Sequence, residues 1–117
     1  MSDEGLEMIE KLPEYEGLRV EFKENWSDTA KKTLIAFANT LGGDLYFGVT
    51  DDGAIKGLGK KALDEVSRSV LQFCRSETDP VMTDIVSTRV IASGVGSFLL
   101  RVSVEPENDR PYAFKGK

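Results

Sequence analysis

The stretch that decides the fold is AKKTLIAFANTLGGDLYFGVTDDG, residues 30–53. Its first part carries apolar side chains at helical spacing, namely Ala30, Leu34, Phe37, Ala38 and Leu41. Gly42 and Gly43 then supply a helix stop. The residues that follow, 45–49, are apolar on both faces, which is typical of a central strand covered on both sides. The stretch therefore predicts a helix that packs on a sheet and leads directly into a buried strand.

The residues before this stretch predict another strand and the beginning of the helix. Apolar and charged side chains alternate from Leu18 to Lys23, so we expect a strand over 18–23 with one charged face. Ser27 is a typical helix N-cap, and the helix is predicted over 28–41. Farther upstream, Leu6–Leu12 has the spacing of a short helix that ends at Pro13.

The residues after the stretch predict the rest of the domain. Asp51-Asp52-Gly53 is a turn signal, and Ile55 is expected to begin a short return strand. A second helix is predicted over 61–75, and two further strands over 83–91 and 98–104. The order is β-α-β-β-α-β-β after a short N-terminal helix. It predicts an α+β domain in which two main helices pack on a mixed β-sheet.

Length and charge set the domain organisation. The chain has 117 residues, 40% hydrophobic and 30% charged, which suits one domain with a core. We divide it into an acidic leader at 1–13, which holds the short helix, and a single domain at 14–117, and we interpret it as a piece of a longer protein. The net charge of −5 lies in residues 1–16, since residues 17–117 are neutral overall. A neutral body can still present a basic face to a nucleic acid.

The residue types also exclude several chemistries. One cysteine and no histidine exclude a disulfide framework, the usual zinc sites and a Ser-His-Asp triad. The first five residues have neither the basic region nor the apolar core of a signal peptide, and no apolar run approaches membrane-spanning length. We therefore expect a cytoplasmic protein with no membrane partner.

Three motifs together carry a family resemblance. They are Glu16-x4-Glu21-Phe22-Lys23, Ala36-Phe-Ala-Asn-Thr-Leu-Gly-Gly43, and Leu45-Tyr-Phe-Gly-Val-Thr-Asp-Asp-Gly53 with Ile55-Lys-Gly57. The combination resembles the AlbA-like putative DNA-binding domain of the Schlafen superfamily over roughly residues 14–115. The resemblance implies an N-terminal module of bacterial transcriptional regulators and RecG-related helicase-like proteins.

The resemblance also implies an alternative, catalytic site. In eukaryotic Schlafen proteins similar carboxylates form a metal-dependent RNA-cleaving site, which here corresponds to Glu16, Glu21 and Asp51 or Asp52. Clustered carboxylates can hold Mg²⁺ or Mn²⁺. The simpler interpretation is a solvated strand face followed by a hairpin turn, which needs no cofactor or metal. We expect no cofactor unless the nuclease alternative holds.

The lysines are the candidate nucleic-acid-binding residues. The set that we single out is Lys23, Lys31, Lys32, Lys56, Lys60 and Lys61. Lysines beside glycines suit phosphate contacts, which need charge and backbone access rather than fixed geometry. The alternative is an ordinary solvated loop. Trp26 and Tyr46 could stack on bases, although single aromatic residues in such positions more often belong to a core.

The remaining motif residues are structural candidates: Phe37, Asn39, Thr40, Gly42, Gly43, Gly48, Gly53 and Gly57. One interpretation is a capped helix end that leads into a buried strand. The other is a corner kept small so that a ligand or partner can approach the backbone.

The sequence thus favours a nucleic-acid-binding module, with DNA as the first choice of ligand and the C-terminal domains of the full-length protein as further partners. A metal-dependent ribonuclease and a protein-interaction or dimerisation domain are the alternatives, and a homo-oligomer stays open.

Overall fold

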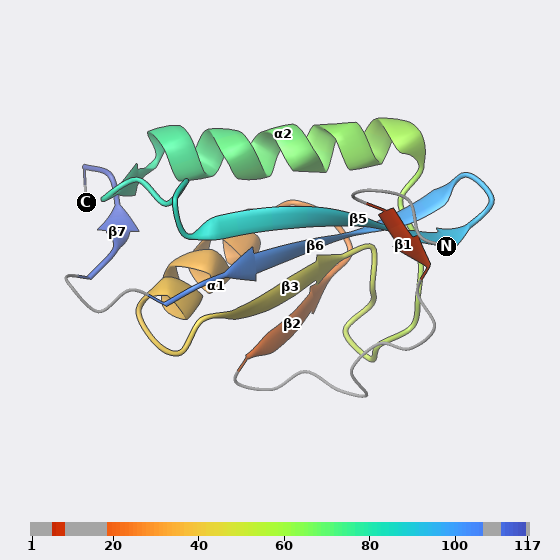
Figure 1. Ribbon diagram of the computed structural model, residues 1–117, viewed down its shortest axis with the longest axis horizontal. Coiled ribbons are helices and arrows are strands. Elements are labelled where there is room, and N and C mark those ends of the chain that lie inside the picture. Colours follow the sequence, from red (N-terminus) through yellow and green to blue (C-terminus); the bar gives the residue numbers. More distant parts are fainter. Residues whose placement is uncertain (1–5, 9–18, 107–110, 117) are drawn as a thin grey trace.

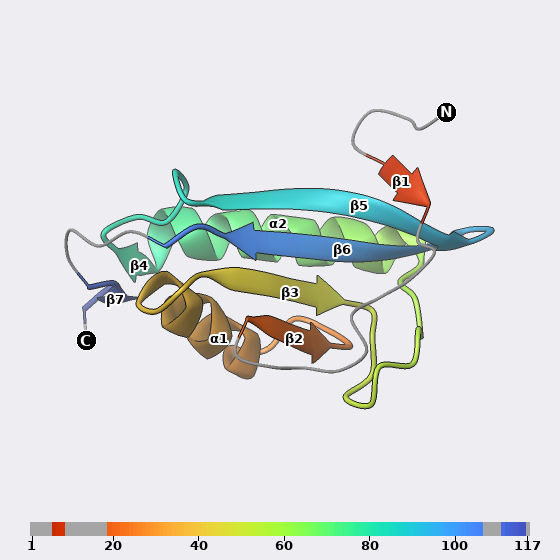
Figure 2. The same cartoon turned by 60° about the horizontal axis from the view of Figure 1, so that its bottom comes forward.

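The computed structural model describes residues 6–8, 19–106 and 111–116, and it contains one mixed sheet with two helices. The strands follow the order β1-β5-β6-β3-β2 across the sheet (Figure 1). Their bounds are β1 Leu6–Met8, β2 Val20–Lys23, β3 Gly43–Phe47, β5 Val86–Gly94 and β6 Ser97–Val104. Strand β2 runs parallel to β3 and β1 parallel to β5, whereas β6 is antiparallel to both of its neighbours, β3 and β5 (Figure 2). The predicted α+β class and mixed sheet are confirmed.

Helix α1 (Asp28–Ala38) begins where the sequence predicts, because the Ser27 hydroxyl accepts a hydrogen bond from the Ala30 N–H at 3.3 Å. It ends three residues before the predicted position. The Gly42 N–H reaches back to the Phe37 carbonyl at 2.9 Å, and Gly42 has a φ of 78°, which closes the turn into β3.

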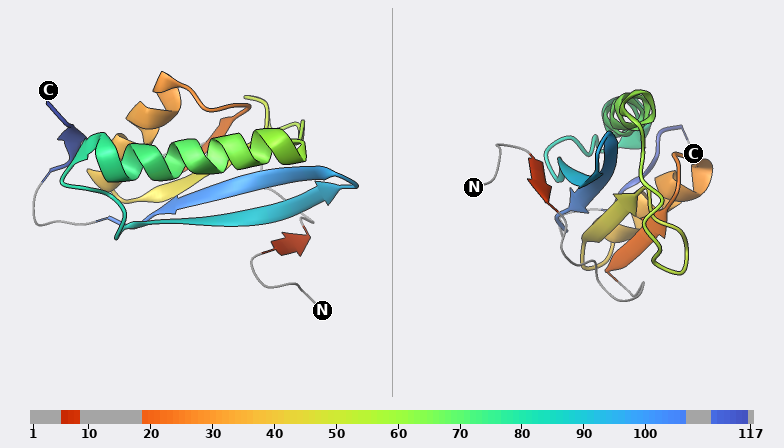
Figure 3. Two further views of the ribbon diagram at one scale, coloured as in Figure 1. Left: turned by 90° about the horizontal axis from the view of Figure 1, so that it is seen from above. Right: turned by 90° about the vertical axis from the view of Figure 1, so that its right-hand side faces the viewer.

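Helix α2 (Lys60–Ser76) lies over β5 and β6, while α1 covers β3, and both helices occupy the same side of the sheet (Figure 3). The main core fills the space between them and the sheet. The largest of its fully buried side chains are Phe47, Phe73, Leu34, Leu45 and Met82. A smaller cluster of Phe22, Tyr46, Val49, Ile91 and Leu99 lies on the helix-free face. Within the described ranges, no helix is long and apolar enough to cross a membrane.

The N-terminal prediction needs a correction. Leu6–Met8 is a strand that pairs in parallel with residues 90–92 of β5, not the start of a helix. Apolar residues three apart suit a helix, but pairing with the open edge of β5 satisfies the backbone equally well. Residues 9–12 of that predicted helix, as well as Leu18, lie outside the described residues.

Three local details also differ from the expectation. Ile55 forms only an isolated bridge with Val49, so it does not begin a strand. Strand β3 stops at Phe47, because Gly48 adopts a φ of 97° and turns the chain. A second, two-stranded sheet joins β4 (Thr78–Asp79) to β7 (Ala113–Phe114).

Candidate nucleic-acid interface

The loop after β3 is built onto the end of β2. Because β2 and β3 are parallel, their carboxyl ends lie at the same end of the sheet. The Gly48 and Val49 N–H groups both point at the Lys23 carbonyl, at 2.8 and 3.3 Å. The Lys56 ammonium then contacts the Glu24 carboxylate at 2.9 Å. The structure therefore brings Lys23 and Lys56 to one end of the sheet.

Glycines let this loop fold back on itself and on the β5–β6 hairpin. Gly57 has a φ of 83°, and a Cβ atom there would lie 2.0 Å from the Ser97 hydroxyl oxygen. The Lys56 and Gly57 N–H groups both donate to the Gly48 carbonyl, at 2.9 and 2.8 Å. Leu58 then bridges to Phe98, and α2 begins two residues later. The first turn of α2, with Lys60 and Lys61, is thereby placed at the same end of the sheet.

Most of these lysines already face a carboxylate. Lys23 contacts Glu21 at 3.5 Å, and Lys60 contacts Asp64 at 3.7 Å. Lys61 forms no ion pair with any described residue. This end of the molecule thus has a mixed charge rather than a simple basic patch.

The other two lysines lie elsewhere. Lys31, on α1, contacts Glu77 at 2.9 Å just beyond the end of α2, and its ammonium lies 5.8 Å from the centre of the Phe73 ring. Lys31 and Lys32 line a groove of about 510 Å³ that also includes Phe114. The structure divides the six lysines singled out in the sequence between two places.

The candidate carboxylates are not gathered into a described metal site. Glu21 shares the helix-covered face of the sheet with its strand partner Leu45 and pairs with Lys23, whereas Asp51 is exposed in the turn after β3. Glu16 lies outside the described residues. Among the residues that are described, no three acidic, histidine or cysteine side chains converge in a way that could hold a metal ion.

Asp52 has a local structural role in the same turn. The Thr50 hydroxyl donates to its carboxylate, and this bond, with backbone N–H donors behind it, lowers the pKa of Asp52 below its usual value. The turn fits hairpin chemistry, which is one of the two interpretations that the sequence left open.

The small corner at the end of α1 is filled by the chain itself. A Cβ atom on Gly42 would lie 2.5 Å from the Val104 carbonyl oxygen, and one on Gly43 would lie 2.8 Å from that of Arg19. Asn39 accepts from the Tyr112 N–H at 2.7 Å and donates to the Tyr112 carbonyl at 2.9 Å. The backbone that approaches Gly42 closely is thus the chain's own.

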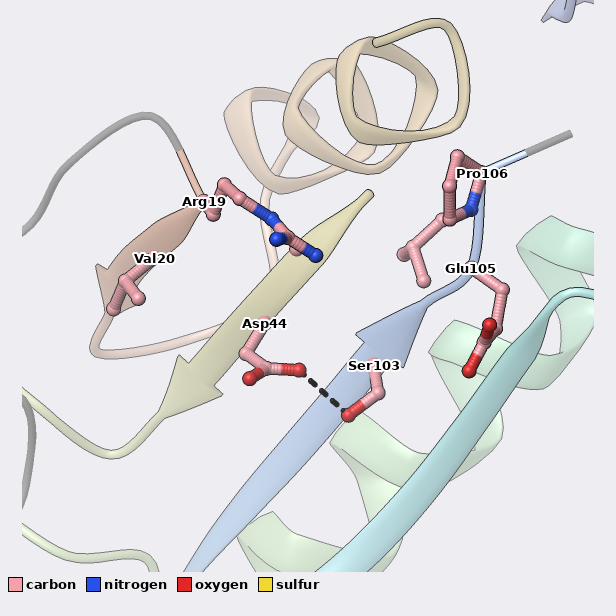
Figure 4. A pocket seen from close by; sticks show the side chains of 8 residues that line it. Arg19, Val20, Asp44, Ser103, Glu105 and Pro106 are labelled. Carbon is pink, nitrogen blue, oxygen red and sulfur yellow. Dashed lines mark hydrogen bonds between the residues drawn. The ribbon is translucent and has the colours of Figure 1, made fainter. Parts of the chain in front are cut away.

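A polar hollow of about 440 Å³ lies at the opposite end of the sheet, where β2 and β3 begin (Figure 4). Arg19, Asp44, Ser103 and Glu105 line it, and the Ser103 hydroxyl donates to Asp44 at 2.7 Å. No local sequence pattern indicates this hollow, because its residues come from three separate segments.

The aromatic residues proposed for base stacking belong to the core. Trp26 packs on Phe47 and Phe73, with ring centres 5.9 and 5.8 Å apart, and Tyr46 is only 7% exposed. None of the other aromatic residues that the structure describes is fully exposed either.

Two further cations on α2 were not singled out in the sequence. Arg68 and Arg75 are exposed and form no ion pair with a described residue. They follow Lys61 at intervals of seven residues. The signal was available, since seven residues are nearly two helical turns and the apolar positions fix which face is outward.

These features define an α+β domain with charged loops at one end of a mixed sheet. A family model described as Schlafen, AlbA_2 matches residues 16–117, and the chain belongs to this family. The match confirms the resemblance seen in the motifs, and the family is consistent with a nucleic-acid-binding domain. No curated protein matches the chain significantly.

Proposed function

We propose that this chain is a nucleic-acid-binding module that contacts the phosphate backbone of duplex DNA, within a bacterial transcriptional regulator or a RecG-related helicase-like protein. Membership of the Schlafen, AlbA_2 family is the observation that carries the proposal. The arrangement of charged and aromatic side chains supports the choice of ligand.

The aromatic residues favour duplex over single strands. Proteins that hold single strands stack bases on accessible aromatic rings. In the described part of the chain every aromatic ring is buried or half-buried, and Trp26 and Tyr46 are occupied by core contacts. Contacts to phosphates through flexible cations need no such platform.

The ion pairs of the lysines do not prevent phosphate binding. The Lys56–Glu24 and Lys60–Asp64 pairs are solvent-exposed, and exposed pairs contribute about 0–1 kcal/mol. A phosphate can therefore replace the carboxylate at small cost. Lys23 is more enclosed, with 18% of its side chain exposed, and we expect it to contribute least.

The test is a titration of the full chain against a labelled duplex DNA, the matching single strand and a structured RNA, each at several salt concentrations. We expect the duplex to bind tightest, with an affinity that falls as salt rises. A triple variant, Lys56→Ala/Lys60→Ala/Lys61→Ala, should bind all duplex sequences more weakly and flatten the salt dependence by up to about three phosphate contacts. Absence of binding to every nucleic acid would favour a protein-interaction domain instead.

The same samples test the nuclease alternative. Incubation of the structured RNA with the chain and millimolar Mn²⁺ or Mg²⁺ should leave the RNA intact. Metal-dependent cleavage that is lost in Glu21→Ala or Asp51→Ala would replace the binding module with a ribonuclease.

A further inference from the structure

The outermost line of α2 is a row of three cations. The buried side chains of this helix are Leu63, Val66, Val70, Phe73 and Cys74, and they mark the face toward the sheet. At 100° per residue, Lys61, Arg68 and Arg75 lie at the pole opposite that face. All three are exposed. We call them the cationic row.

No other helix or strand that the structure describes covers this row. Figure 1 shows α2 along one side of the molecule with β5 and β6 beneath it, so the row points away from the sheet. The exposed face of a helix is often an ordinary solvated surface whose charges pair four residues apart. Lys60 follows that pattern with Asp64, at 3.7 Å. The three cations of the row do not, because none of them pairs with a described carboxylate.

The surroundings of the row become less acidic toward its C-terminal end. Glu65 and Asp64 flank the first half, and Asp64 is already held by Lys60. Between Arg68 and Arg75 the neighbouring outward residues are Leu71 and Gln72, which are uncharged. From Leu71 to Arg75 the helix therefore presents positive charge without an acidic residue beside it, whereas Arg68 has Asp64 and Glu65 one turn before it.

The spacing of the row suits a duplex backbone. Seven residues of α-helix rise about 10 Å, so the row is about 21 Å long. Neighbouring cations thus lie about as far apart as the two phosphate strands that border a DNA major groove, which is about 12 Å wide. With no exposed aromatic ring among the described residues, base stacking adds nothing to such a contact.

We infer that the cationic row of α2 is a phosphate-contacting surface for duplex DNA, distinct from the loop lysines at the end of the sheet. The inference rests on the proposed function and names a second contact surface for it. The contact is to the backbone and is independent of base sequence.

The decisive variant is Arg68→Gln/Arg75→Gln, which keeps polar, helix-compatible side chains at exposed positions. At 0.1 M salt each lost phosphate contact should weaken duplex binding by about eightfold at most, so we expect a loss of about 10- to 60-fold. The slope of log affinity against log salt should become shallower by about 2. Urea unfolding of each variant checks that the fold is retained.

A charge-matched control separates the row from net charge. Arg19→Gln/Arg89→Gln removes the same two charges at exposed positions away from α2, and Arg89 lies on the helix-free face of the sheet. We expect a change of less than about threefold for this control. In the opposite direction, Glu65→Gln removes a carboxylate beside the row and should tighten binding by about two- to fourfold.

The outcomes distinguish the two proposals. If the unmodified chain binds duplex DNA and Arg68→Gln/Arg75→Gln binds equally well, the row is not a contact surface while the proposed function stands. Equal losses in this variant and in the charge-matched control would also overturn the inference, since binding would then follow total charge. If the unmodified chain binds no nucleic acid, the proposed function fails and the inference fails with it.

Discussion

Asn39 shows how one side chain joins two distant segments. It is the C-cap residue of α1, and its side-chain amide forms two hydrogen bonds with the backbone of Tyr112, at 2.7 and 2.9 Å. Tyr112 is 5% exposed, and Phe114 packs on Phe73 with ring centres 5.9 Å apart. Asn39 therefore helps to hold residues 111–116 against the ends of both helices.

We expect Asn39→Ala to lower the free energy of unfolding by about 1–3 kcal/mol, because the Tyr112 backbone loses both side-chain partners. Asn39→Asp keeps the acceptor for the Tyr112 N–H but loses the donor to the Tyr112 carbonyl. Its stability should therefore lie between that of the unmodified protein and that of Asn39→Ala. Urea denaturation of the three proteins measures the differences. If Asn39→Asp proved less stable than Asn39→Ala, the two bonds would not be the reason for the effect.

A second prediction concerns the buried thiol of Cys74 and the pH dependence of stability. It is 1% exposed in the core, and burial raises the pKa of its thiol from 9.0 to about 11. The folded state therefore keeps the proton that the unfolded chain loses above pH 9, and stability should fall as the pH rises from 9 to 11. The loss attributable to this thiol is about 2–3 kcal/mol.

The comparison protein for this effect is Cys74→Ala. It should be less stable at neutral pH, since it leaves a small cavity, but its stability should depend less on pH between 9 and 11. Thermal unfolding of both proteins across this range gives the result. A parallel decline in the two proteins would show that other groups, not the thiol, cause the alkaline loss.

At the scale of elements, the sequence predicted the two helices well, because a helix is determined by contacts between residues that are close in the chain. Helix α1 begins at the predicted Ser27 cap, and α2 matches its predicted range to within one residue at each end. Strand β1 could not be found in the same way. Its partner is β5, more than eighty positions later in the chain, and three residues carry too little pattern to distinguish a strand from a helical turn.

Helix α2 begins without a side-chain cap. Its N-cap is Gly59, with φ −70° and ψ 173°, and a Cβ atom there would have no neighbour within 4 Å. Gly59→Ser adds a hydroxyl that can accept from the first turn and reduces the freedom of the unfolded chain. We expect an increase in stability of about 0.5–1 kcal/mol.

Urea denaturation tests this gain, with Gly42→Ser as the contrasting variant. Gly42 has a φ of 78° and the Val104 carbonyl 2.5 Å from the position of a Cβ atom, so the same substitution there should be strongly destabilising. If Gly59→Ser destabilised the protein as much as Gly42→Ser does, the glycine at the start of α2 would have a steric role.

At the scale of the whole molecule, the sequence predicted least well which charged side chains pair with one another. The sequence singles out the lysines, but two of them have partners at distant positions, namely Lys31 with Glu77 and Lys56 with Glu24. No local spacing reveals such pairs. The row on α2 was predictable in principle, because Leu63, Val66 and Val70 already mark the face opposite to it.

The last prediction concerns the acidic leader and the three residues after it, since residues 1–16 together hold the whole net charge of −5. Shortening the chain there is a poor test, because residues 6–8 form β1 and cover the edge of β5. Asp3→Asn/Glu4→Gln/Glu10→Gln instead raises the net charge by three while β1 keeps its sequence. Long-range repulsion of the phosphates then falls, and duplex affinity should rise by about two- to fivefold at 50 mM salt, with little change at 300 mM. Stability should stay within about 0.5 kcal/mol. Weaker binding by this variant at low salt would mean that the leader contributes to the contact, and the view that cations on the domain determine affinity would have to be abandoned.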